Sequence, residues 1–162
     1  MEPYGDETEE AFFEAFAEQA KALEAGGADA VIVETMTSIE ECCVAVRAVR
    51  SCTQMTVVAS FTFDPLIHGG YASMMGVHPE AFALAAAAAG AHIVGSNCGL
   101  GPDHMINIVR ELRGSVPTLP LLAMPNAGMP ELIDGQTVFR ETPDGMAAKS
   151  RELRKAGASL IG

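Results

Sequence analysis

The chain contains 162 residues, of which 49% are hydrophobic, and it carries a formal net charge of −11; this is enough sequence for one domain with a core. The acidity argues against nucleic-acid binding, because phosphates demand clustered Lys and Arg, and no apolar run approaches the roughly 18 residues of a membrane span. An N-terminus rich in Asp and Glu is unlike a secretory signal, so we expect a cytoplasmic protein.

Helical and strand patterns alternate along the whole chain. The first helix repeats apolar residues at Phe12, Phe16, Ala20 and Leu23 and ends at Gly26-Gly27, as an amphipathic helix does. Ser38 is the expected N-cap of the second helix and Asp103 that of the fourth. The patterns predict helices over 9–24, 38–50, 79–89, 103–113 and 144–155, strands over 30–33, 55–61, 92–95, 121–124 and 159–161, and loops over 64–78 and 125–143.

Three of the helix-to-strand junctions follow one design. Each has a glycine that ends a helix, a small residue, one polar residue and then branched apolar residues. Repeated junctions of this kind indicate equivalent βα units and therefore a parallel α/β fold. The three junctions are Gly27-Ala28-Asp29-Ala30-Val31-Ile32, Gly90-Ala91-His92-Ile93-Val94 and Gly157-Ala158-Ser159-Leu160-Ile161.

A parallel α/β chain forms either an open doubly wound sheet or a (β/α)8 barrel. The turns lack the glycine-rich fingerprint of doubly wound nucleotide binders. Polar groups instead follow strand after strand, which is typical of a TIM barrel. We predict an incomplete TIM barrel, because the chain supplies about five βα units as one domain over 1–162, where a full barrel has eight. These strand-end groups are Glu34-Thr35, Thr62-Asp64, Asn97-Cys98 and Asn126.

The four cysteines differ in their settings. Cys42 and Cys43 fall on the expected buried face of the second helix, where small hydrophobic roles are favoured. Cys52 lies in a polar turn after that helix and carries no signal. Cys98 stands between an apolar strand and a glycine-rich turn, and this position suits contact with a metal or a substrate. A small core thiol remains the alternative for Cys98.

Three motifs occur in a fixed order at strand ends: Glu34-Thr35, Gly95-Ser96-Asn97-Cys98 with Gly101-Pro102, and Pro125-Asn126-Ala127-Gly128-Met129-Pro130. Together they resemble the homocysteine S-methyltransferase family, above all the homocysteine-binding barrel of the cobalamin-dependent methionine synthase type. The likeness runs from about Pro3-Tyr4-Gly5-Asp6 to Gly162, practically the whole chain. The resemblance implies transfer of a methyl group to the thiol of homocysteine, giving methionine.

The resemblance also implies a zinc ion held by three cysteine thiolates, of which Cys98 is one. The other two form a Gly-Gly-Cys-Cys motif in the family, and Gly162 matches its first glycine, so we expect that pair after Gly162. Zinc would lower the pKa of the homocysteine thiol, which makes Cys98 a ligand and not a catalytic residue. Methylcobalamin bound elsewhere is one methyl donor the family uses, and cobalamin-binding and folate-binding domains or the rest of the barrel are the implied partners.

The same resemblance assigns substrate contacts to Glu34, Asn97 and Asn126. Glu34 would bind the ammonium group of homocysteine, and the two asparagines would orient the substrate or the strand-end loops. A solvated carboxylate or a helix cap is the structural alternative for Glu34, and an Asx turn for Asn126. A catalytically silent fragment, or a partial barrel that works by association, is the functional alternative for the chain.

Overall fold

The structure is a computed structural model that describes residues 5–162, so Pro3 and Tyr4, where the likeness to the family begins, lie outside the described residues. Five parallel strands form one sheet in the order β1-β2-β5-β6-β9. The predicted parallel α/β fold is confirmed. The strands are β1 (Ala30–Met36), β2 (Thr56–Phe61), β5 (Ile93–Asn97), β6 (Leu121–Met124) and β9 (Leu160–Ile161).

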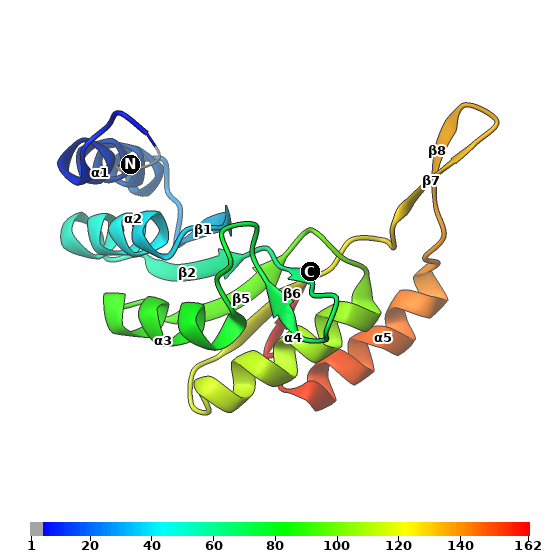
Figure 1. Ribbon diagram of the computed structural model, residues 1–162. Coiled ribbons are helices and arrows are strands. Elements are labelled where there is room, and N and C mark those ends of the chain that lie inside the picture. Colours follow the sequence, from blue (N-terminus) through cyan, green and yellow to red (C-terminus); the bar gives the residue numbers. More distant parts are fainter. Residues whose placement is uncertain (1–4) are drawn as a thin grey trace.

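Five helices alternate with these strands and pack on one side of the curved sheet (Figure 1). Neighbouring helices contact each other in chain order, as expected when each βα unit packs beside the next. None of the helices within residues 5–162 has both the length and the apolar character of a membrane-crossing segment. The helices are α1 (Glu9–Ala25), α2 (Ile39–Cys52), α3 (Pro79–Ala89), α4 (Pro102–Ser115) and α5 (Pro143–Ala156).

The helix ends confirm one predicted cap and correct another. Ser38 caps α2, because its side chain accepts a hydrogen bond from the Glu41 main-chain N–H. The prediction that Asp103 caps the fourth helix is wrong: Gly101 is the N-cap of α4, and Pro102 occupies the first helical position. Proline fits there because its fixed φ suits a helix and its missing N–H would have no partner. Cys52 also belongs to the last turn of α2 rather than to a turn after it.

The core lies between the sheet and the helices. Alternate strand residues such as Val57, Ala59, Val94 and Leu121 face the helices and are buried with them. The residues between them, including Ser60, Asn97 and Leu122, therefore belong to the opposite, concave face of the sheet. The two edge strands leave apolar side chains of this face exposed, with Ile32 and Leu160 each 40% exposed.

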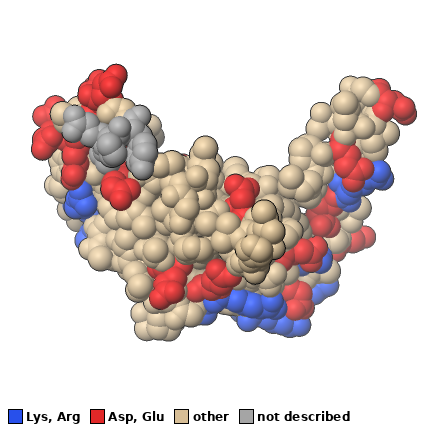
Figure 2. All heavy atoms as spheres, in the orientation of Figure 1, with Lys and Arg blue, Asp and Glu red and all other residues tan. Residues whose placement is uncertain are grey.

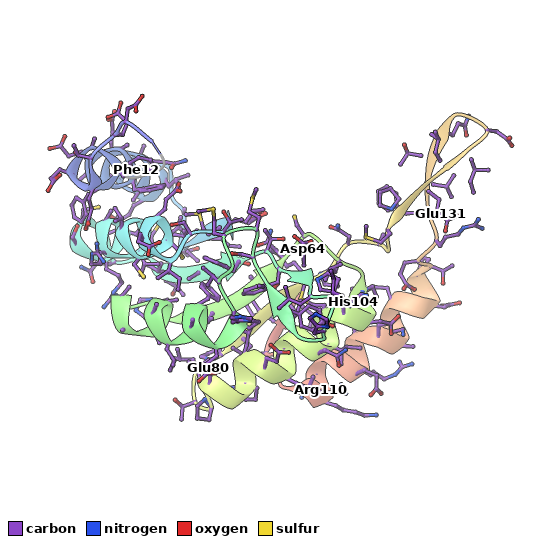
Figure 3. The ribbon with its side chains drawn as sticks, viewed as in Figure 1. Phe12, Asp64, Glu80, His104, Arg110 and Glu131 are labelled. Carbon is purple, nitrogen blue, oxygen red and sulfur yellow. The ribbon has the colours of Figure 1, made fainter. Side chains whose placement is uncertain are left out.

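Two antiparallel hairpins occupy segments that the sequence predicted as loops. Strands β3 (Asp64–Pro65) and β4 (Tyr71–Ala72) pair after β2, and β7 (Pro130–Ile133) and β8 (Gln136–Phe139) pair after β6. The β7–β8 hairpin projects away from the helices and the sheet (Figure 1), and Glu131 on it lies at the opposite end of the molecule from Phe12 on α1 (Figure 3). Its turn uses Asp134 and Gly135, both with positive φ, as a two-residue hairpin turn requires.

The charges are also distributed unevenly. Six of the ten Lys and Arg residues of the sequence lie on α4 and α5, where they form the blue region at the lower right of Figure 2. Acidic side chains gather over α1 at the other end of the molecule (Figure 2). The six cationic residues are Arg110, Arg113, Lys149, Arg151, Arg154 and Lys155.

Strands β5 and β6 approach each other closely at Gly95. A Cβ atom at this position would lie 2.4 Å from the main-chain oxygen of Leu122 and 2.6 Å from its Cβ. These separations are far below normal contact, so one of the two strands would have to move. Glycine is therefore required here for the space it leaves, and its φ is not in the left-handed region.

We predict that Gly95→Ala lowers the free energy of unfolding by about 1–3 kcal/mol, as overpacking of a core does. The matched control is Gly114→Ala in the last turns of α4, where a new Cβ meets nothing within 4 Å and should stabilise the helix by up to about 1 kcal/mol. Urea unfolding of both variants measures the difference. Equal stabilities for the two variants would contradict the close approach of β5 and β6.

Candidate functional site

Cys98 follows directly after β5, at the carboxyl end of the sheet, and its side chain is exposed. Its φ is +57°, a left-handed conformation that is uncommon for residues other than glycine. The Cys98 main-chain N–H donates to the Met124 carbonyl oxygen at 3.1 Å. The thiol is therefore presented to solvent from a backbone that the neighbouring strand holds in place.

The Asn97 side chain, by contrast, is only 1% exposed and forms four hydrogen bonds. Its Oδ1 accepts from the Thr35 main-chain N–H at 3.1 Å and from the Ser60 hydroxyl at 2.6 Å. Its Nδ2 donates to Thr35 Oγ1 at 2.7 Å and to Cys98 Sγ at 3.2 Å. An amide has two donor hydrogens and two acceptor positions, so protein groups use all of its capacity and favour the loop-orienting role of Asn97.

Glu34 lies one residue before Thr35 and is exposed. It is one of the residues around a cavity of about 300 Å³ between α1 and β1. Phe16 and Gln19 line the same cavity from the helix, and Ile32 lines it from the strand. The structure therefore places the Glu34 carboxylate at an open edge of the sheet, where a cationic group could reach it.

Asn126 contacts the turn that contains Cys98 through its main chain. Its N–H donates to the Leu100 carbonyl oxygen at 3.0 Å, and its half-buried side chain forms no hydrogen bond to another described residue. Gly101 and Gly128 pack so closely that a Cβ on Gly101 would lie 3.2 Å from the Gly128 Cα. The loop after β6 thus supports the turn that contains Cys98.

Residues 1–162 match the family described as homocysteine S-methyltransferase. The chain belongs to this family. It is 30% identical over 151 residues to methionine synthase of Mycobacterium leprae and 30% identical over 155 residues to methionine synthase of Mycobacterium tuberculosis. Both matches cover 92% of this chain but only 12% and 13% of those proteins, so the chain spans about an eighth of the length of these relatives.

Solved structures show the same fold. The homocysteine methyltransferase MmuM from Escherichia coli matches in its apo form with a TM-score of 0.74 and in its metallated form with 0.76, at 21% identity in both. The matches cover 97% and 98% of this chain and 52% and 48% of the E. coli chain. The chain therefore has the fold of about half of a TIM barrel of this family.

The zinc site implied by the resemblance can be tested against the described residues. No three His, Cys, Asp or Glu side chains within residues 5–162 come together as a group that could hold a metal ion. Zinc sites in proteins use three or four protein ligands. The residues described here offer one thiol at the carboxyl end of the sheet and do not complete the implied site.

The other three cysteines lie in α2. Burial raises the pKa of the Cys42 thiol to about 12, and it also raises the pKa of Cys43. A thiol with a raised pKa stays protonated at neutral pH and is a poor nucleophile and a poor metal ligand. The packing role predicted for Cys42 fits its burial in the core, whereas Cys43 is only half-buried.

Two histidines form contacts that connect neighbouring elements of the fold. His92 Nδ1 accepts from the Val57 main-chain N–H at 3.0 Å. His104 Nδ1 lies 3.1 Å from the Tyr71 hydroxyl, so α4 is tied to the β3–β4 hairpin. His92 precedes β5, so its contact lies at the end of the sheet opposite to Cys98.

Ser60 is the residue of the site that the sequence did not indicate. It lies inside an apolar strand and is fully buried, and its hydroxyl donates to Asn97 Oδ1. The available signal was one polar residue in an apolar strand. Ser60 stands between Ala59 and Phe61, and its side chain lies on the other face of the strand. Its significance depends on the register of β2 with β5, which pairs Ser60 with Gly95.

We predict that Asn97→Ala lowers the free energy of unfolding by about 3 kcal/mol, because it leaves the buried Ser60 hydroxyl and the Thr35 N–H without their partner. Asn126→Ala is the matched control and should change stability by less than about 0.5 kcal/mol. Chemical unfolding followed by circular dichroism gives both values. A loss at Asn97 no larger than that at Asn126 would show that the network contributes nothing to stability.

Proposed function

We propose that this chain is a homocysteine-binding module of a zinc-dependent homocysteine S-methyltransferase, in which Cys98 is one ligand of the metal. The observation that carries the proposal is an exposed thiol at the end of β5 whose sulfur accepts a hydrogen bond from a buried amide, in a chain that matches the family over its whole length. The remaining ligands would come from outside the described residues.

The thiol has the properties that a metal ligand needs. It lies at the carboxyl end of the strands, where TIM barrels collect their functional groups. The Asn97 amide donates to its sulfur and so orients it, as groups behind a metal ligand do. Cys98 in this role binds the metal and does not itself attack the methyl group; zinc, when bound, would favour the thiolate form of homocysteine.

Glu34 is the proposed contact for the ammonium group of homocysteine. Its exposed carboxylate belongs to the edge strand β1, in the half of the strand nearer the end of the sheet that holds Cys98, and a carboxylate with an ammonium group forms a charge-assisted hydrogen bond. Asn126 supports the loop beside Cys98 through Leu100. Asn97 orients Cys98 and Thr35 rather than the substrate, because its four hydrogen-bonding positions are occupied.

The same proposal includes methylcobalamin as one candidate methyl donor. It also includes partner domains that bind cobalamin and folate, and a cytoplasmic location. The two methionine synthases that the chain resembles are about eight times its length, which leaves room in those proteins for further domains.

A second candidate is a catalytically silent partial barrel that works by association. It is favoured by the single thiol at the site and by the exposed Ile32 and Leu160 on the concave face.

A hybrid barrel separates these candidates. In it, residues 1–162 replace the structurally matching half of E. coli MmuM, and methionine formation from homocysteine is measured with S-methylmethionine or methylcobalamin as donor. We predict activity with about one zinc per hybrid and far less than one zinc per isolated 162-residue chain after dialysis, because one thiol binds zinc weakly. Cys98→Ser should lower activity at least about 100-fold, and Cys52→Ser is the control.

Metal analysis and circular dichroism of each hybrid show whether it is folded and loaded before activity is compared. A folded hybrid whose activity and zinc content survive Cys98→Ser contradicts the metal role of Cys98. A folded hybrid that binds zinc through other groups and forms no methionine favours the silent partial barrel. Stoichiometric zinc on the isolated chain would also contradict the proposal, since the described residues lack a set of ligands.

A further inference from the structure

We propose that Thr35 and Ser60 are positioning residues of the site: through the Asn97 amide they hold the Glu34–Thr35 peptide of β1 and the Cys98 thiol after β5 in one fixed arrangement. The inference rests on the function proposed above for Cys98 and Glu34. It assigns to two residues on neighbouring strands a role that their own side-chain chemistry does not reveal. Neither residue has to touch the substrate for this role.

The first support is a bulge in β1. Val33 pairs with Ala59 and Met36 pairs with Phe61, so three steps along β1 match two along β2. The extra residue gives Thr35 a φ of +59°, a conformation that costs a β-branched residue on the order of 1–3 kcal/mol. Bulges of this kind re-aim side chains and often occur next to functional sites.

The second support is that one side chain stabilises both strained residues. Asn97 accepts from the Thr35 N–H and donates to Thr35 Oγ1, and it also donates to the sulfur of Cys98, whose φ is +57°. The Thr35 N–H belongs to the peptide group that follows Glu34. Glu34, the proposed ammonium contact, is therefore joined by a peptide bond to a residue that the Asn97 amide binds. Cys98, the proposed metal ligand, is bound by that amide itself.

The Thr35 main-chain N–H fixes which way this amide faces, and the Ser60 hydroxyl gives the same oxygen a second donor. A main-chain N–H cannot act as an acceptor, so Oδ1 has to lie on this side. The NH2 group is then directed to Thr35 Oγ1 and Cys98 Sγ. Because Ser60 lies on β2, between β1 and β5, the network crosses three strands and couples the two edges of the proposed site.

A packing role alone does not account for this arrangement. Buried polar groups cost free energy unless every one of them is paired, and an apolar side chain would fill the same space without that demand. Ser60 is 0% exposed and Asn97 is 1% exposed, yet all four positions of the amide are used. The network therefore fixes the positions of the groups that it joins. These groups are the bulge of β1 and the exposed Cys98 thiol at the end of the sheet.

The test is long-range coupling between residue 35 and Cys98 in the 162-residue chain. Incorporation of ¹³Cβ-cysteine gives one NMR signal for each of the four free thiols, assigned by single Cys→Ser variants. We predict that Thr35→Val, which keeps the shape of the side chain but removes Oγ1, shifts the Cys98 signal by more than its linewidth. Ser60→Ala should also shift it, whereas Thr35→Ser should leave it at its original position.

Thr56→Val, an exposed position at the opposite end of β2, is the matched control and should leave all four signals unchanged. Spectra are compared under conditions where unfolding curves show each variant to be folded. An unmoved Cys98 signal in both Thr35→Val and Ser60→Ala overturns the proposal. Equal shifts of the α2 cysteines also overturn it, because they indicate a general change in packing.

The result is independent of the proposed methyl transfer. If the coupling is observed and the hybrid barrel is folded but inactive, the proposed function fails while the connection between the strands stands. If the hybrid is active and the coupling is absent, Cys98 acts without help from Thr35 and Ser60. The two failures therefore give different patterns of results.

Discussion

The carboxyl end of this sheet depends on one buried amide. Asn97 joins three strands through four hydrogen bonds, and it binds two residues whose backbones adopt the left-handed conformation. In a buried environment such bonds are stronger than in water, and a missing partner costs correspondingly more. The shared amide therefore couples the shape of the β1 bulge to that of the turn after β5.

This arrangement divides the thiols of the chain into two kinds. Burial keeps the pKa of Cys42 near 12 and leaves that thiol suited to packing in α2. Cys98 is exposed and receives an amide hydrogen bond at the end of the strands. The family match over residues 1–162 is the reason for proposing that Cys98 binds a metal. The described residues hold no group of three ligands, so the proposed site needs further groups.

The helices and the parallel strands could be predicted from the sequence because their signals are local. Apolar spacing, the glycine junctions and the Ser38 cap all act within a few residues. Asp103 was misread because Asp is a common N-cap, but Pro102 already occupies the first helical position. The strands β3, β4, β7 and β8 were missed because each has two to four residues and lies in a segment with several Gly and Pro residues, which is typical of a loop.

The candidate site was predicted in part for the same reason. Cys98, Asn97 and Glu34 stand at strand ends and are visible in the sequence, whereas Ser60 lies inside a strand and joins the site only through the register of β2 with β5. The left-handed conformation of Thr35 could not be predicted from the sequence either, because the residues around Thr35 do not favour it. It depends on a side chain 62 positions away, and contacts at such separations follow from the fold and not from local pattern.

Amide hydrogen exchange at Thr35 tests the central claim, that Asn97 holds the bulge of β1, most directly. Thr35 is an exposed residue of an edge strand, so without the Asn97 bond its N–H would face water and exchange quickly. The account predicts slow exchange, comparable to that of the β2 amides. Exchange as fast as that of Ile67, which is 97% exposed in the loop after β2, would contradict it.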